Sequence, residues 1–114
     1  MNDDSLTIAP VGGVIAVRAG GAVLAESSEA LAATAPGAEA PVHWLPMADA
    51  SLFLDRTEQI RDIPGVGAAR GYDINAKSGP IPLAAWALEA PAAGAEALKD
   101  HVFFEGERVA VERL

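Results

Sequence analysis

The chain has 114 residues, of which 51% are hydrophobic, and it carries 16 acidic against 8 basic residues for a formal net charge of −8. A chain of this length fits one domain with a single core, and its acidity disfavours nucleic acid and anionic membranes as partners, because both are negatively charged. The absence of cysteine excludes disulfides, thiolate catalysis and cysteine-based zinc sites.

The amino terminus shows no targeting signal. Its first residues, MNDDSLTIAP, are acidic, whereas a secretory signal peptide begins with a basic region. No stretch of about 18 residues is apolar enough to cross a bilayer. We therefore expect a cytoplasmic protein in which residues 1–12 form a tail and residues 13–114 form a single domain.

Turn residues and apolar runs in the first half of the chain predict short elements. Residues 14–25 pass from an apolar run through Gly20 and Gly21 to a second apolar run. This pattern is typical of a β-hairpin, because glycine accepts the positive φ that tight hairpin turns require. Residues 27–34, SSEALAAT, begin with a serine cap and favour a short helix, and residues 42–46 favour a strand that ends at a proline.

The second half of the chain continues with more strands. Residues 47–50 are compatible with one helical turn, and the alternation that follows favours a strand over 52–55. Residues 61–71 are rich in turn formers and indicate a loop, whereas 72–76 alternate like a strand. Residues 83–90 fit a helix or a strand by composition, and the closely bracketing prolines favour the strand.

The last two elements complete a mainly β domain. The alanine-rich residues 92–100 favour a short helix, and residues 101–114, HVFFEGERVAVERL, favour a second hairpin with Val109 and Val111 on one face. The predicted fold class is therefore mainly β, with small antiparallel sheets and one or two short helices.

The glycine-rich stretch DIPGVGAARGYDI, residues 62–74, is the segment most suggestive of a phosphate-binding loop. Its glycines are spaced G-x-G-x-x-x-G, one residue longer than the dinucleotide fingerprint, which also requires a helix directly afterwards. A strand-like segment follows instead, and the Lys-Ser/Thr pair of a P-loop is missing. We interpret this stretch as a bend between strands.

Five short motifs occur in an order that resembles one known family. They are GGAVLAES, PVHWLPMADA, DIPGVGAARGY, AAWALEAP and HVFFEGERVAV. Their order is similar to that in the DUF427 family, a group of small bacterial and fungal domains without an established activity. The resemblance runs from about Gly13 to Leu114, and it implies a compact Mss4-like, or β-tent, fold in which two small antiparallel sheets meet at an angle.

The chain departs from that family in the glycine-rich motif. Members typically have His-Cys-Pro followed by Lys; the residues here are Asp62, Ile63, Pro64 and Val66. Three explanations stay open: the site works without a thiol, this member is inactive, or the family cysteine is structural. The family has also been described as nucleotidyltransferase-like, but this sequence lacks the Gly-Ser and Asp-x-Asp pattern that would bind the metal for that chemistry.

Eight side chains are candidate ligand contacts. They are His43, Trp44, Arg56, Arg70, Tyr72, Asp73, Trp86 and Glu89. The three rings among them lie near turn-rich segments, and we expect them to gather at one cleft. A tryptophan beside a carboxylate, as in Trp86 and Glu89, can form a stacking wall with a polar anchor.

The two arginines have two interpretations. A guanidinium group can hold an anionic ligand through two parallel hydrogen bonds. Alternatively, Arg56 and Arg70 balance nearby acidic residues, for which Asp55, Glu58 and Asp73 are the candidates. Ion pairing within the protein is the favoured interpretation.

The two histidines, His43 and His101, do not indicate a metal site. Without cysteine, a metal would need aspartate or glutamate as further ligands, and their spacing shows no such cluster. We predict neither a metal nor a cofactor.

Three functional hypotheses follow. The first is a non-catalytic module that binds a small molecule or a peptide in a sheet cleft. The second is an enzyme that uses carboxylate acid–base chemistry, with Glu89, Asp73 or Glu58 as base and Arg70 or His43 as electrophile. The third is a homo-oligomeric structural protein that pairs through the edge of its closing hairpin.

Overall fold

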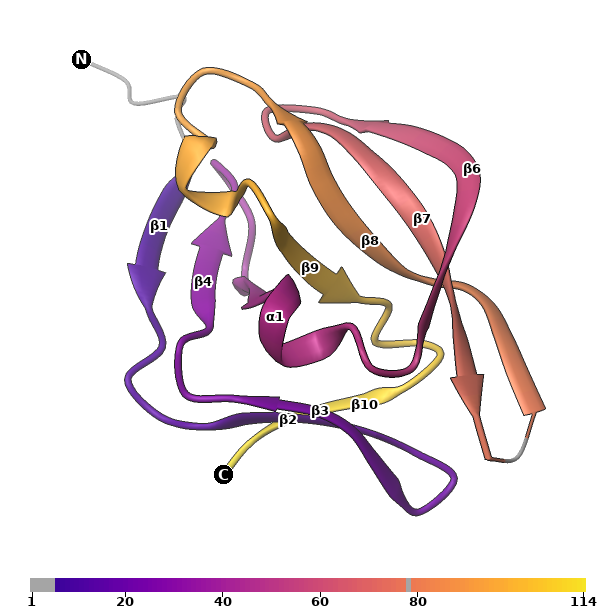
Figure 1. The fold of residues 1–114 in the computed structure, drawn as a ribbon. Coiled ribbons are helices and arrows are strands. Elements are labelled where there is room, and N and C mark those ends of the chain that lie inside the picture. The colour runs from indigo at the N-terminus through magenta and orange to yellow at the C-terminus, as the bar shows by residue number, and fades with distance from the viewer. Residues whose placement is uncertain (1–5, 78) are drawn as a thin grey trace.

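The computed structural model describes residues 6–77 and 79–114, and it confirms a mainly β fold built from two antiparallel sheets. The seven strands of the larger sheet are, in spatial order, β1 (Thr7–Pro10), β4 (Leu31–Thr34), β5 (Val42–Pro46), β9 (His101–Phe104), β8 (Gly79–Pro91), β7 (Gly67–Ala76) and β6 (Leu54–Ile63). The smaller sheet holds β10 (Ala110–Arg113), β2 (Ile15–Ala19) and β3 (Ala22–Ser27). Figure 1 shows the smaller sheet below the larger one.

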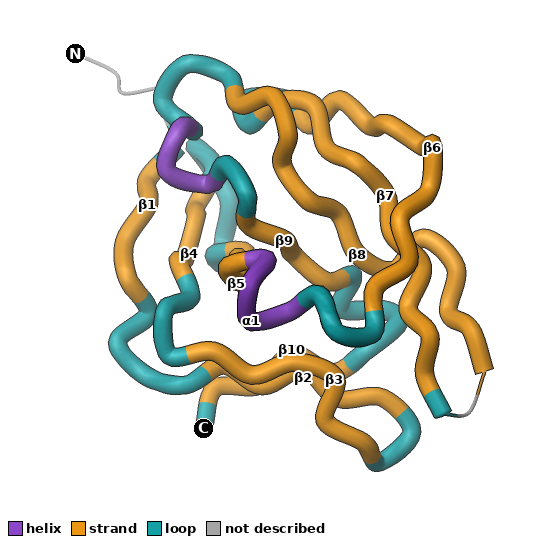
Figure 2. The backbone as a smooth tube through the Cα atoms, in the orientation of Figure 1, coloured by secondary structure: helices purple, strands orange, loops and turns teal. Residues whose placement is uncertain are grey.

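Among residues 6–77 and 79–114, helical structure is confined to two short pieces, which Figure 2 marks in purple. The helix α1 (Met47–Ala50) packs against β3, β5 and β9. The Ser27 hydroxyl donates a hydrogen bond of 2.6 Å to the Asp49 carboxylate and thereby ties β3 to α1. The helix predicted over 92–100 is only the 3-10 turn η1 (Glu96–Leu98). Within the described ranges, no helix is long and apolar enough to cross a membrane.

The hairpin predicted over 14–25 is confirmed as β2 and β3, and the strands predicted over 42–46 and 83–90 lie within β5 and β8. The helix predicted over 27–34 is wrong. Residues 31–34 form β4, which pairs with β1 on one side and β5 on the other. Pairing on both edges outweighs the helix propensity of the alanines.

Part of the expected tail belongs to the larger sheet. Thr7–Pro10 form β1, which pairs with β4. Residues 1–5 of that tail lie outside the described residues, as does Ser78.

The prediction of a closing hairpin over 101–114 is also wrong. β9 lies between β5 and β8 in the larger sheet, whereas β10 pairs with β2 in the smaller one. A turn in which the Arg108 amide donates to the Glu105 carbonyl, at 2.9 Å, carries the chain from one sheet to the other. Each strand found a partner that is distant in sequence, so the local pattern could not separate them.

The glycine-rich stretch is a hairpin, which confirms the bend between strands. β6 extends to Ile63 and β7 begins at Gly67, so the predicted loop over 61–71 consists mostly of strand. The turn closes with a hydrogen bond of 2.9 Å from the Val66 amide to the Ile63 carbonyl. Because no helix follows the glycines, the arrangement of a dinucleotide-binding loop is absent from this described segment.

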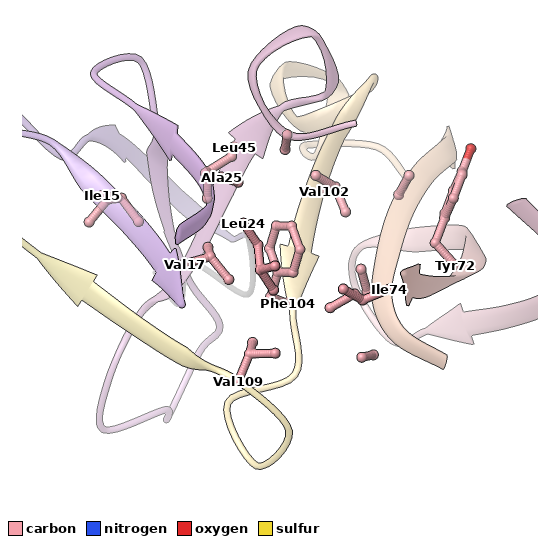
Figure 3. Packing of buried hydrophobic residues seen from close by; sticks show 14 of the residues in the cluster. Ile15, Val17, Leu24, Ala25, Leu45, Tyr72, Ile74, Val102, Phe104 and Val109 are labelled. Atoms are coloured by element: carbon pink, nitrogen blue, oxygen red, sulfur yellow. The ribbon is translucent and has the colours of Figure 1, made fainter. Parts of the chain in front are cut away.

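The main core fills the space between the two sheets. Ile15, Val17 and Leu24 come from the smaller sheet and meet Leu45 and Phe104 of the larger one, as Figure 3 shows. The first three and Leu45 are at most 5% exposed. Burial of such side chains contributes about 1.5–3 kcal/mol each and holds the sheets together.

A second core lies on the other face of the larger sheet. Trp44, Leu88 and Leu98 are its large buried members, and Phe103 packs against them. The larger sheet is therefore covered on both faces along β5, β9 and β8, which explains why the middle of β8 is an unbroken apolar run rather than an alternating one.

The hairpin geometry predicts unequal effects of two neighbouring glycine substitutions. Gly67 has φ +130°. A Cβ added at this position would collide with the Ala90 carbonyl oxygen and would lie 2.9 Å from the Pro91 Cα. Gly65 has φ +77° but open space around it. We expect G67A to lower the free energy of unfolding by about 3 kcal/mol or more and G65A by about 1–2 kcal/mol. Urea denaturation measures both, and equal losses would contradict the close packing of β7 against β8.

Candidate functional site

Three aromatic side chains form a row across the second-core face of the larger sheet. The ring centroids of Trp44 on β5 and Phe103 on β9 are 4.9 Å apart. Phe103 is in turn the cross-strand partner of Trp86 on β8. Directly opposite residues share one face of a sheet, so all three side chains lie on the same face. We call Trp44, Phe103 and Trp86 the aromatic row.

A glycine lets the row extend over β7. Gly71 is the cross-strand partner of Trp86, and a Cβ at this position would lie 3.0 Å from the indole ring and 2.8 Å from Leu83. These approaches are too close for a side chain. The indole therefore lies against bare backbone.

Arg61 crosses from β6 onto this same indole. It is the partner of Ala69, which precedes Gly71 by two residues and so shares its face. The Arg61 guanidinium carbon is 5.4 Å from the centre of the Trp86 ring, within the range of a cation–π interaction. Its Nη1 is 3.8 Å from a Glu105 carboxylate oxygen.

A cavity of about 240 Å³ opens beside the row. Its floor includes the Trp44 and Phe103 rings, and its walls come from β4, the loop after it and the β6–β7 turn. The remaining lining residues are Leu6, Ala33, Ala35, Ala38, Ala40, Val42, Arg61, Ile63, Pro64 and Val66. Arg61 is the only charged side chain among these described residues.

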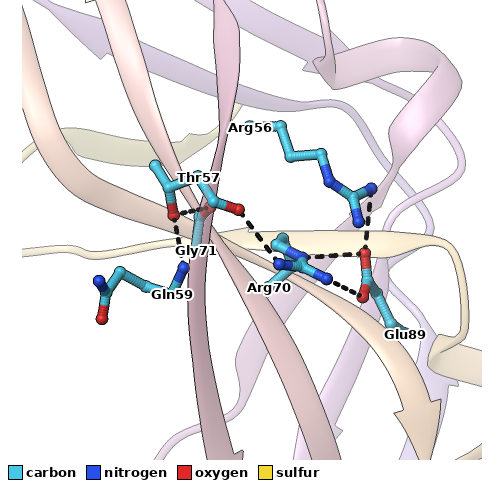
Figure 4. A network of polar contacts seen from close by, with 6 residues as sticks. All are labelled: Arg56, Thr57, Gln59, Arg70, Gly71 and Glu89. Atoms are coloured by element: carbon cyan, nitrogen blue, oxygen red, sulfur yellow. Dashed lines mark hydrogen bonds and ion pairs between the residues drawn. The ribbon is translucent and has the colours of Figure 1, made fainter.

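A separate polar cluster occupies the strands β6, β7 and β8 and consists of Arg56, Thr57, Arg70 and Glu89 (Figure 4). Arg70 donates from Nε and Nη2 to the two Glu89 carboxylate oxygens at 3.4 and 3.3 Å. Arg56 reaches the same carboxylate at 3.4 Å. The Arg70 side chain is 18% exposed, against 59% for Arg56, so Arg70 depends more strongly on its partners.

Bulges in two strands bring the polar cluster together. In β8 the register shifts between the partners of Ala68 and Ala69, which leaves Glu89 as the extra residue. In β6 the shift falls between Arg56 and Ile60. There the Thr57 hydroxyl donates to the Gly71 carbonyl at 2.7 Å, and the Thr57 carbonyl accepts from Arg70 at 3.3 Å.

The structure brings some of the predicted site residues together and separates others. Trp44 and Trp86 share the aromatic row, and Arg56, Arg70 and Glu89 share the polar cluster. The expectation that all three rings gather at one cleft is wrong. Tyr72 follows Gly71 on β7, points to the opposite face and is buried in the main core.

The expected pairing of Trp86 with Glu89 is also wrong, because each side chain has other partners. Glu89 contacts arginines of the polar cluster, and the charged group over Trp86 is Arg61. Ion pairing of Arg56 and Arg70 within the protein is confirmed, although the carboxylate is Glu89 rather than one of the neighbouring acidic residues.

Asp73 and His43 belong to neither the aromatic row nor the polar cluster. The Asp73 carboxylate accepts a hydrogen bond of 2.8 Å from the amide of Leu83, which has φ +47°. It thus supports a strained backbone position in β8. The half-buried His43 lines a hollow of about 290 Å³ at the seam of the two sheets, with Phe104 and Val111. Residues 6–77 and 79–114 contain no group of three or more metal-ligating side chains.

Sequence reasoning missed two contributors to this face, Arg61 and Phe103. Arg61 fell in the segment interpreted as a loop, so its alternation was not considered. Phe103 fell in the predicted closing hairpin, where its partner would have been a residue of β10 instead of Trp86. The usable signal was the alternation of Val102 and Phe103 along a strand, which places them on opposite faces.

Fold and site together define a small antiparallel β domain with two sheets and an aromatic-floored cavity on the outer face of the larger one. The chain belongs to the DUF427 family, a domain of unknown function, whose match covers residues 7–114. A comparison with curated proteins finds no match.

The polar cluster predicts a clear order of stability effects for two carboxylates. Glu89 serves two guanidinium groups, one of them mostly buried, whereas Glu112 pairs at 2.8 Å with Arg18, whose side chain is 43% exposed. We expect E89A to lower the free energy of unfolding by about 1–2 kcal/mol, since it leaves the Arg70 guanidinium without its carboxylate partner. E112A should lower it by about 0.5 kcal/mol. Denaturant titrations of both variants measure this, and a larger loss for E112A would contradict it.

Proposed function

We propose that this domain is a non-catalytic binding module that takes a small, largely apolar molecule into the cavity beside the aromatic row. The observation that carries the proposal is the cavity itself. It has about 240 Å³ of space, an aromatic floor and, among its described lining residues, a single charge. Ligand sites are mostly apolar hollows with few, convergent polar groups. A cavity of about 150 Å³ lined by apolar side chains accepts benzene, so this one suits a ring with a short substituent.

The size of the cavity favours a small molecule over the peptide that the sequence left open. A peptide needs an extended groove or a free strand edge. The cavity is instead a short hollow bordered by the loop over 35–41 and by the β6–β7 turn, so a compact ligand fits it better.

The contacts of the carboxylates favour binding over acid–base catalysis. Both oxygens of Glu89 are engaged by arginines, and Asp73 already accepts the Leu83 amide. Glu58 is exposed on β6. A general base needs a lone pair free to reach a substrate proton, and the cavity has no carboxylate among its described lining residues.

The sheet edges formed by β1, β10 and β6 weigh against self-association by strand pairing, and the edge strand β3 is packed by α1. β1 is four residues long and ends in Pro10, and β10 is equally short. β6 is long, but a bulge interrupts it and exposed charged residues cover it. Short, charged or bulged edges discourage further pairing. The cytoplasmic location stays a prediction of the sequence.

Ligand screening with a cavity-blocking variant tests this proposal. Ala38 is exposed and lies at the rim of the cavity, so A38W should fill the opening without disturbing the core. Ala110 is equally exposed but lies on β10, and A110W is the matched control. In thermal shift experiments with small aromatic and branched aliphatic compounds, a ligand at 100 times its Kd adds about 2.7 kcal/mol of stability.

We expect that stabilisation in the native protein and in A110W, and its loss in A38W. A ligand that stabilises A38W as much as the native protein would place binding elsewhere. A panel without a single stabilising compound would contradict the proposed function.

A further inference from the structure

Among the three arginines of the β6–β7 hairpin, Arg61 has far fewer partners than Arg70. Arg70 directs Nε, Nη1 and Nη2 to a carboxylate and a carbonyl of the protein. Arg61 makes no hydrogen bond among the described residues, and its one ion pair, to Glu105, is 3.8 Å long. A guanidinium group offers five N–H donors. The Arg61 donors are therefore largely unused by the protein.

Arg61 is nevertheless held in place at the cavity. The Trp86 ring lies 5.4 Å from its guanidinium carbon, and the two small residues Ala69 and Gly71 leave room for it on the sheet face. A cation–π contact of this kind favours a guanidinium placed over the ring while its N–H groups stay available. A positioned cation with free donors at the rim of an apolar cavity is suited to an anionic group.

We infer that the cavity binds a small carboxylate whose apolar body lies on Trp44 and Phe103 and whose carboxylate replaces Glu105 as the partner of Arg61. The inference rests on the proposed function, because it names the chemical class of the ligand for the same cavity. Arginine binds carboxylates through paired hydrogen bonds in one plane. The Glu105 side chain is 37% exposed, so it can turn into solvent when it is displaced.

The exchange at Arg61 predicts opposite effects of two substitutions. R61M removes the cation but keeps an apolar stem over Trp86, so it should weaken carboxylate binding about tenfold or more. E105Q removes the competing carboxylate, so it should strengthen carboxylate binding about two- to fivefold, the range of an exposed ion pair. Binding of a neutral ligand of the same shape should depend much less on either substitution, because it does not exchange with the Glu105 carboxylate.

The experiment compares 3-phenylpropanoate with its neutral amide, 3-phenylpropanamide, in NMR titrations of the full chain. The chain has two tryptophans. Trp44 lines the cavity and Trp86 lies under Arg61, so the indole N–H resonance of Trp44 reports binding in the cavity and that of Trp86 reports a change at Arg61. The controls are R108M and E107Q, which make the same changes of charge at exposed residues that do not line the cavity.

We expect the acid to bind at least about tenfold more tightly than the amide. R61M should weaken and E105Q should strengthen binding of the acid as described above, and neither control should change it. Equal affinities of acid and amide, with both indole resonances moving, would overturn the inference and leave the proposed function standing. An R108M loss as large as that of R61M would also overturn it, because the effect would then be one of overall charge. Neither compound moving an indole resonance would overturn both. If R61M fails to fold, the gain expected for E105Q decides the question.

Discussion

The contact between the Trp86 indole and the bare backbone of Gly71 is the constraint on which the outer face of the larger sheet depends. A Cβ at position 71 would lie 3.0 Å from the ring. Because this space is empty, the indole extends the aromatic row toward β7 and provides the surface over which Arg61 is placed. The Trp86 end of the row and the cation over it follow from the cross-strand pairing of β7 with β8, whereas the cavity is lined by the Trp44 and Phe103 rings of β5 and β9.

The two faces of the β6–β7–β8 unit serve different purposes. The polar cluster fastens the three strands through Glu89, with Thr57 holding the bulge in β6. Arg70 uses its donors for this and has little left for a ligand. The face with Arg61 is apolar and opens to a cavity, and the Arg61 N–H donors have fewer protein partners there than those of Arg70. Strand fastening and the proposed ligand binding thus rest on separate arginines that belong to one hairpin.

The sequence predicts the local part of this fold and misses the non-local part. The Gly20–Gly21 turn specifies its own hairpin, and the prolines around residues 83–90 mark β8 as a strand. By contrast, β9 and β10 separate because β9 pairs with β5 and β8 and β10 pairs with β2, and both β5 and β2 are far away in the chain. The candidate residues Trp44, Trp86, Arg70 and Glu89 were recognised individually, but their partners depend on register and bulges. The alternation of side chains along a strand predicts neither the register nor the position of a bulge.

The central claim is that Trp86 lies across Gly71 and within reach of the other rings of the row. An NOE spectrum of the isotopically labelled protein tests this directly, because proton pairs closer than about 5 Å, the contact range of side chains in a folded core, give cross-peaks. The account predicts cross-peaks between the Gly71 Hα protons and the six-membered ring of Trp86, and between the rings of Trp44 and Phe103. A Trp86 ring that instead shows contacts to Tyr72 and the main core would contradict it.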